Sequence, residues 1–175
     1  MIFEIFILRE GAPPLFAFDF LFRCVIMLES QGKCKESFMD YVRYIWDGFI
    51  EGEHHRLIAD KLTEVAQGKC KRLIVNMPPR HTKSEFASVY FPSWVMGLKP
   101  DMKIMQTTHT ADLSVRFGRK VRNLMDTDEY KRMFNDVSLA ADSKSAGRWQ
   151  TSQGGEYFAA GVGGAITGRG ADLLI

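Results

Sequence analysis

Residues 77–85, Met-Pro-Pro-Arg-His-Thr-Lys-Ser-Glu, carry the side chains whose order most suggests chemistry. They follow an apolar run, residues 71–77, that predicts a buried strand, and they precede a segment with helical spacing. A loop between a buried strand and a helix directs unbonded backbone N–H groups at one point, where the helix dipole adds partial positive charge. We therefore expect an anion to bind there. If that anion is a triphosphate, Lys83 would reach its β and γ oxygens and Ser84 would ligate Mg²⁺.

The loop departs from the phosphate-loop pattern GxxxxGK[ST], because Met77 and Thr82 occupy the two glycine positions. Thr82 is the more serious departure, since its Cβ restricts both the backbone torsion and the approach of a phosphate. The alternative interpretation is a polar helix start after a Pro-Pro turn, with no ligand. The pattern alone leaves both interpretations open.

Helices are expected on both sides of this loop. The spacing of apolar residues predicts them over residues 37–50, 55–67 and 111–125, with a shorter one after the loop that Pro92 kinks or ends. Thr110 is the expected N-cap of the helix over 111–125. The buried stripe of that helix is expected to consist of four residues: Leu113, Phe117, Val121 and Leu124.

Strands are expected between these helices. Besides residues 71–77, apolar runs predict strands over residues 102–107, 156–162 and 171–175. The alternation of strand and helix predicts an α/β fold with a mainly parallel sheet, right-handed crossovers and flanking helices. Residues 135–148 are polar and are expected to connect these elements.

Composition fits one folded domain in 175 residues, because 46% of them are hydrophobic and 25% are charged. The net charge of +2 argues neither for nor against nucleic acid. The three cysteines show no metal-finger spacing, which indicates reduced thiols in a reducing compartment. His54 and His55 are adjacent and would point about 100° apart on a helix, so we do not expect them to form a zinc site.

Residues 1–36 form a hydrophobic N-terminal extension of uncharacterised role. Charged residues divide it into apolar pieces too short to span a membrane, and it lacks the basic start of an export signal. One hypothesis is that the segment lies upstream of the true start and that Met27 is the initiator. N-terminal mass spectrometry tests this hypothesis, because a peptide from residues 2–22 would contradict it.

Three blocks of the sequence together resemble a known family. KRLIVNMPPRHTKSEFAS, QTTHTADLSVRFGRKVR and GGEYFAAGVGGAITGRGADLLI are similar, in this order, to blocks of the ATPase domain of the large terminase subunit of tailed bacteriophages. The resemblance covers residues 37–175. It implies a P-loop NTPase-like sheet that is incomplete at its C-terminus, in a DNA-packaging protein of a phage or prophage.

The resemblance also implies roles for single residues. The Walker A-like loop consists of Pro79, Arg80, His81, Thr82, Lys83 and Ser84 and would bind ATP, with Ser84 on Mg²⁺. Arg80 resembles an arginine thought to sense the γ-phosphate; a solvated loop arginine or a DNA contact is the alternative. Many family members have Gly at the position of Thr82.

The last block, residues 171–175, resembles the start of the Walker B strand, whose catalytic acids come after the apolar run. The chain ends at Ile175, and Asp172 stands at the beginning of that strand. We therefore expect this chain to bind nucleotide without hydrolysing ATP at a useful rate, and to lack the nuclease of the full-length family. Comparing phosphate release with that of a version extended through the missing acids tests this expectation.

Basic residues gather on the helix over 111–125. Arg116, Arg119, Lys120 and Arg122 lie opposite the expected apolar stripe and either contact DNA phosphates or form a solvated face. The family's partners are double-stranded DNA, the portal protein and the small terminase subunit, and its motors are homo-oligomers in the host cytoplasm. His81 is expected to support the loop, and His109 to line the nucleotide cleft.

Two alternatives to a packaging ATPase stay open. Another P-loop DNA translocase or helicase domain would share the strand, the Lys-Ser loop and the Walker B strand. An inactive prophage-derived fragment would bind nucleotide or no ligand. The glycine-rich residues 161–170 match neither a dinucleotide fingerprint nor a second phosphate loop, so tight turns are the alternative to a family role in coupling nucleotide state to movement.

Overall fold

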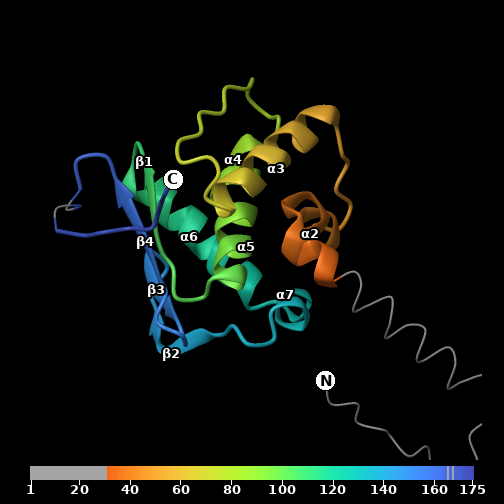
Figure 1. Cartoon of the computed structure of the whole chain (residues 1–175). Coiled ribbons are helices and arrows are strands. Elements are labelled where there is room, and N and C mark those ends of the chain that lie inside the picture. The colour runs from red at the N-terminus through yellow and green to blue at the C-terminus, as the bar shows by residue number, and fades with distance from the viewer. Residues whose placement is uncertain (1–30, 165, 167) are drawn as a thin grey trace, which may run out of the picture.

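A computed structural model describes residues 31–164, 166 and 168–175 (Figure 1). The hypothesis about Met27 and most of the N-terminal extension fall outside these residues. Residues 31–36 are helical, and Ser37 then caps the next helix. No helix in the described part of the chain is long and apolar enough to cross a bilayer.

Helices precede and follow the loop in the sequence (Figure 1). Two precede it, α2 (Phe38–Ile45) and α3 (Glu53–Ala66). One continuous helical run follows it, made of α4 (Lys83–Glu85), the π-helical η1 (Phe86–Tyr90) and α5 (Phe91–Leu98). The last two are α6 (Ala111–Met125) and the short α7 (Asp128–Met133).

The five described strands form one mixed sheet in the order β2-β3-β4-β1-β5. Their bounds are β1 (Lys103–Thr108), β2 (Leu139–Lys144), β3 (Arg148–Thr151), β4 (Glu156–Gly161) and β5 (Leu173–Leu174). β1 pairs in parallel with β4 and β5, whereas the β2–β3 and β3–β4 pairs are antiparallel. The α/β class is confirmed, but the expectation of a mainly parallel sheet is wrong, because half of the pairings are antiparallel.

The β2–β3 hairpin is the source of the antiparallel pairings. Its first strand lies within the polar stretch over residues 135–148, where no strand was predicted, and its second strand begins at the end of that stretch. Trp149 supplies the buried anchor of the hairpin, with its ring stacked on Tyr157 of β4 at 4.9 Å between centroids. Trp149 and Tyr157 are directly paired across the two strands, and a cross-strand aromatic pair contributes roughly 0.2–1 kcal/mol to a sheet.

The strand predicted over residues 71–77 is absent from the sheet. This segment is extended but unpaired, and Ile74 is 85% exposed. Leu73, Val75 and Met77 do pack against the core, so alternate side chains point inward as in a strand. The apolar run predicted an extended backbone correctly, but a strand also requires a partner edge, and the described sheet ends at β5.

The helical run after the loop passes through Pro92 without ending there. Pro92 lacks the N–H that would bond to the carbonyl four residues earlier, and the chain responds with a π-helical turn in which the Phe91 N–H donates to the Phe86 carbonyl. The prediction of a kink or an end at Pro92 is therefore replaced by a local change of helical pitch. The run packs its apolar side chains into the core, where Phe86 and Trp94 are fully buried.

Helix α6 has the predicted bounds, and the Thr110 hydroxyl accepts from the Leu113 N–H as expected of an N-cap. The predicted buried stripe is only partly correct: Val121 is buried and Phe117 and Leu124 are half-buried, but Leu113 is 39% exposed. The other buried positions are Ser114, Gly118 and Met125. Gly118 explains the difference. It lets α6 approach the sheet so closely that a Cβ there would lie 2.8 Å from the Ala146 carbonyl oxygen.

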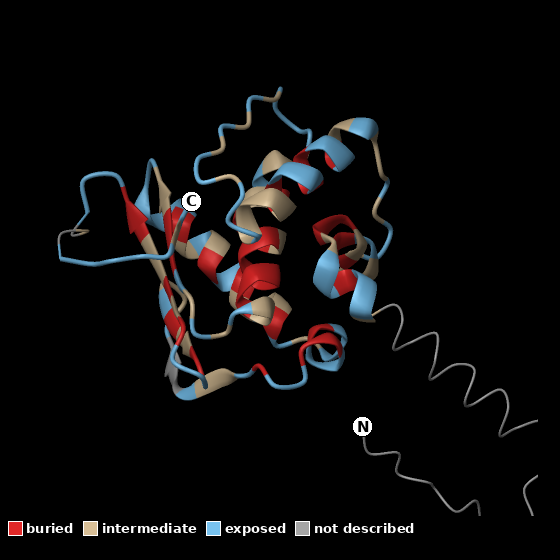
Figure 2. Ribbon diagram, viewed as in Figure 1, coloured by how far each residue is buried: buried red, intermediate tan, exposed pale blue. Residues whose placement is uncertain are grey.

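The core lies between the helices and one face of the sheet (Figure 2). Tyr41 of α2, Ser93 of α5 and Tyr130 of α7 meet there through hydrogen bonds, since the Tyr41 and Ser93 hydroxyls are 2.6 Å apart and the Tyr130 hydroxyl donates to the Ser93 carbonyl. These buried polar groups connect three helices without leaving the hydroxyls unpaired. The helical run that begins at the loop is therefore held firmly from both sides.

Candidate functional site

The candidate loop, residues 78–82, joins the extended segment to α4. In Figure 1, α4 lies toward the same end of the molecule as the carboxyl end of β1 and the C-terminus. Ligands of parallel α/β sheets commonly bind at that edge. The Phe86 N–H donates to the Thr82 carbonyl at 3.0 Å and so begins the helix, and the donors of the first turn point out of the helix toward the loop.

Two residues of the loop have left-handed backbone conformations. Arg80 has φ 65°, and Thr82 has φ 59° and ψ 4°. A left-handed residue is a common place for glycine and a rare one for a β-branched side chain. The sequence indicated that a Cβ at Thr82 would restrict this torsion; the structure shows that Thr82 nevertheless adopts the conformation that glycine would.

Lys83 is half-buried and folds back across the loop. Its Nζ donates to the Pro78 carbonyl at 3.3 Å, so the ammonium group lies beside the loop instead of extending away from it. Ser84 follows it in the first helical turn and is exposed. Lys83 is therefore directed at the loop, and Ser84 is accessible to solvent next to it.

Residues 78–81 are exposed and Thr82 is half-buried, and two residues of the loop brace its backbone. The His81 Nδ1 is 2.8 Å from the Pro79 carbonyl oxygen, and the Thr82 hydroxyl donates to the His81 carbonyl at 2.7 Å. His81 thus has the supporting position expected of it. Arg80 is exposed at the left-handed turn.

His55 of α3 is a functional candidate whose contact with the loop the sequence did not predict. Its Nε2 lies 2.6 Å from the Thr82 hydroxyl oxygen, and its Nδ1 accepts from the Gly52 N–H at 2.9 Å. Burial lowers the pKa of His55, and the neighbouring His54 lowers it further. His55 and Thr82 are separated by 27 residues. No spacing rule connects positions that far apart, so only the fold reveals the contact.

The predicted DNA-contact residues are not equivalent on α6. Arg116 and Arg119 are exposed, whereas Lys120 forms an ion pair with Glu85, the residue after Ser84. Arg122 is half-buried and donates to the Asn123 side chain. The pair between Lys120 and Glu85 connects α6 to the first turn after the loop.

Asp172 lies at the opposite end of β5 from the expected catalytic edge. Its carboxylate accepts from the Lys103 N–H at 2.8 Å, at the amino ends of both strands. At the other end, the Thr107 hydroxyl donates to the Ile175 carbonyl at 3.0 Å. The expectation that Asp172 cannot replace the Walker B acids agrees with this position. His109 is exposed just beyond β1.

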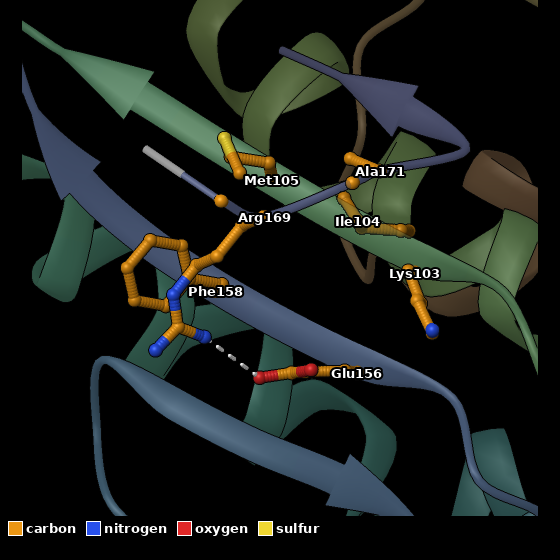
Figure 3. Close-up of a pocket in the computed structure, with 9 residues that line it drawn as sticks. Lys103, Ile104, Met105, Glu156, Phe158, Arg169 and Ala171 are labelled. Carbon is orange, nitrogen blue, oxygen red and sulfur yellow. Dashed lines mark hydrogen bonds and ion pairs between the residues drawn. The ribbon is translucent and has the colours of Figure 1, made fainter. Parts of the chain in front are cut away.

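The glycine-rich segment contains tight turns. Gly163 and Gly168 have positive φ values of 89° and 82°. Between this segment and the sheet lies a cavity of about 200 Å³, where the Arg169 guanidinium stacks over Phe158 and donates to Glu156 (Figure 3). A second cavity of about 260 Å³ lies between α3 and residues 73–77 and ends at Asn76 and Met77, just before the candidate loop.

Comparisons of the chain with protein-family models, with curated proteins and with solved structures find no match. The function is therefore argued from the loop and its surroundings.

Proposed function

We propose that residues 37–175 are the ATP-binding part of a viral DNA-packaging ATPase, the large terminase subunit of a tailed phage or prophage, with a P-loop NTPase-like fold. The observation that carries the proposal is the loop geometry. Thr82 has a glycine-like backbone at the position before Lys83, and the Lys83 ammonium group folds over the loop. A bare helix start after a Pro-Pro turn would require neither feature.

The residues present fit a nucleotide with a divalent cation. In the proposed complex the first-turn N–H groups of α4 and the Lys83 ammonium bind the phosphate oxygens, replacing the Pro78 carbonyl as the partner of Lys83. The Ser84 hydroxyl is an oxygen ligand of the kind that Mg²⁺ prefers. Arg80 supplies a second positive charge at the loop for the γ-phosphate. A bound Mg²⁺ would neutralise charge on the phosphates.

The base of the nucleotide has a candidate position as well. The segment EGEHHRLIA, residues 51–59, resembles one that precedes the P-loop in related ATPases and lies beside the adenine ring there. The groove beside the loop is lined by His54, Leu57 and Val75, among others, and is mostly apolar, which suits a planar aromatic ring.

The proposal includes the family's partners and location. Double-stranded DNA would contact Arg116 and Arg119 on α6, and the portal protein and the small terminase subunit would assemble with a homo-oligomeric motor in the bacterial host cytoplasm. The ion pair between Lys120 and Glu85 offers a physical connection between the DNA-facing helix and the loop. Asp172 has no part in the proposed nucleotide site, because its carboxylate is bonded at the far end of the strand.

Titration of the full chain with a fluorescent ATP analogue and Mg²⁺ tests the proposal. Lys83→Ala should weaken binding by at least about tenfold, the usual effect of losing a charge-assisted contact to phosphate. Lys99→Ala is the matched control, since Lys99 lies at the far end of the same helical run and bonds to the Ala66 carbonyl. Equal affinities of wild type and Lys83→Ala would refute ATP binding at this loop.

A further inference from the structure

Thr82 occupies a conformation that its side chain disfavours. Left-handed backbone is rare for β-branched residues, and such a residue persists only where its surroundings hold it. The structure shows what holds this one, because the Thr82 hydroxyl oxygen is bonded on two sides, to His55 and to the His81 carbonyl. Gly at this position would need neither contact.

The hydrogen bonds around His55 have one consistent direction. The Gly52 N–H donates to Nδ1, which therefore carries no proton, and a neutral imidazole must then carry its proton on Nε2. Nε2–H donates to the Thr82 hydroxyl oxygen, and the Thr82 hydroxyl donates to the His81 carbonyl. These hydrogen bonds therefore form one series in which each donor points from Gly52 toward the candidate loop.

The imidazole is packed so that it cannot easily turn. His55 is 6% exposed, stacked on Phe86 at 5.1 Å between ring centroids and in edge contact with Phe49 at 4.9 Å. Phe86 belongs to the helical run that the loop begins. Movement of the ring would therefore disturb both the loop and the helix that carries Lys83.

We infer that His55 is a positioning residue for the candidate phosphate loop: its neutral imidazole holds Thr82 in the left-handed conformation, and protonation of His55 releases the loop and weakens nucleotide binding. The inference rests on the proposed function and adds to it a pH-dependent control of the same site. It also assigns to His55 the structural task that a glycine at position 82 would make unnecessary.

The second proton is incompatible with the observed bonds. A protonated imidazole donates from both nitrogens, so the Gly52 N–H would face another donor. The titratable groups around the ring are His54 on the same helix, His81 from the loop and Glu51 from the preceding turn, while η1 contributes the apolar Phe86. Burial and then His54 lower the pKa of His55 below its ordinary 6.5, and Glu51 opposes this shift. The His55–Thr82 hydrogen bond is therefore intact at pH 7–8 and is lost as the pH falls through the lowered pKa of His55.

A double-mutant cycle on the full chain tests the inference. With Mg²⁺ and a fluorescent ATP analogue at pH 8, His55→Ala should weaken binding roughly tenfold in the Thr82 background, the scale of one lost hydrogen bond and one strained residue. In the Thr82→Gly background the same change should have less than about a twofold effect. Thr82→Val, which lacks the hydroxyl but keeps the branched Cβ, should resemble His55→Ala. Equal effects of His55→Ala in both backgrounds would overturn the inference.

The pH dependence is tested with a non-titrating variant. Gln can donate to Thr82 from its amide nitrogen but does not ionise, so His55→Gln should bind at pH 8 and keep that affinity at pH 5.5. Wild type should lose more affinity over that range than His55→Gln does, a comparison that cancels the titration of the nucleotide itself. His54→Ala should move the wild-type midpoint to higher pH. Parallel pH profiles for wild type and His55→Gln contradict the inference.

A readout without nucleotide separates failure of the inference from failure of the proposed function. Nuclear magnetic resonance of the imidazole nitrogens should report the Nε2–H tautomer of His55 at pH 8 and a pKa below 6.5, and Thr82→Val should change both signals. If neither wild type nor Thr82→Gly binds the analogue, the proposed function fails while these signals still test the bond. An Nδ1–H tautomer of His55 would refute the proposed hydrogen bond from His55 to Thr82 in either case.

Discussion

Replacing Gly118 by Ala tests the packing of α6 that brings Lys120 to the candidate loop. A Cβ at this position would lie 2.8 Å from the Ala146 carbonyl oxygen and 2.9 Å from Tyr157 Cε1. Neither neighbour can give way easily. One is backbone, and the other is a fully buried ring stacked on Trp149, whose indole N–H donates to the Gly118 carbonyl at 3.2 Å. Real Cβ atoms essentially never approach other atoms this closely.

The magnitude follows from two opposing effects. Ala favours a helix interior over Gly by about 1 kcal/mol. Overpacking a filled core costs typically 1–3 kcal/mol, and the rigid neighbours here put the cost at the upper end of that range. We therefore expect Gly118→Ala to lower the free energy of unfolding by about 1–2 kcal/mol, which corresponds to a fall in Tm of roughly 2–8 °C for a domain of this size.

Thermal unfolding followed by circular dichroism measures this loss. Gly32→Ala is the matched control, because Gly32 is also helical but a Cβ there meets no atom within 4 Å. The control should be as stable as wild type or up to about 1 kcal/mol more stable. A Gly118→Ala variant with an unchanged or higher Tm would refute the close approach of α6 to the sheet.

Arg119→Glu should weaken the binding of a double-stranded DNA fragment, measured by fluorescence anisotropy. It should also reduce the slope of log affinity against log salt concentration by about 1, because one phosphate contact is lost. An unchanged slope would show that Arg119 is not part of the DNA interface. Burial raises the pKa of the Cys34 thiol to about 11, whereas Cys70 is half-exposed. A thiol reagent at pH 8 should therefore modify Cys70 before Cys34. Peptide mass spectrometry that shows the reverse order would contradict the burial of Cys34. The Arg43 guanidinium beside Glu51 holds the pKa of that carboxyl near 2, so its contribution to stability is complete above about pH 4.5 and is lost as the pH falls toward 2. Glu51→Gln should therefore cost about 1–2 kcal/mol at pH 7, discounted for the exposure of the arginine, and an equal pH dependence of unfolding in the two proteins would refute this.

Short-range sequence signals correctly predicted the elements that depend mainly on residues close together in the sequence. The helix over residues 111–125 has the predicted bounds because an N-cap, an acidic first turn and helical spacing all lie within it. The direction of its buried face was predicted only in part, because Val121 is buried but Leu113 is exposed. Gly118 adds no hydrophobic signal yet determines which side can approach the sheet. Small residues at a close contact are a systematic weakness of predictions from apolar spacing.

Pairing between distant segments could not be predicted in the same way. The apolar run at residues 71–77 indicated an extended chain, but whether an extended chain becomes a strand depends on an available edge. The β2–β3 hairpin illustrates the opposite case, since polar residues there form strands because Trp149 anchors them on Tyr157. In both cases the prediction missed which strand, if any, a segment pairs with, because the residues of the segment itself do not determine its partner.

The candidate loop has the left-handed backbone that underlies the phosphate-loop pattern, but it lacks the glycine by which the pattern is recognised. Glycine is usual before the lysine of a phosphate loop because the backbone there is left-handed, and the pattern therefore counted Thr82 as a defect. The structure gives Thr82 that same backbone and adds the bonds to His55 and His81 that stabilise it. A search for glycines misses such a loop, whereas a search for the left-handed torsion followed by a helical Lys-Ser pair finds it. If the proposed function is correct, the replacement of Gly by Thr has a chemical consequence as well: the loop conformation comes to depend on the protonation of a histidine.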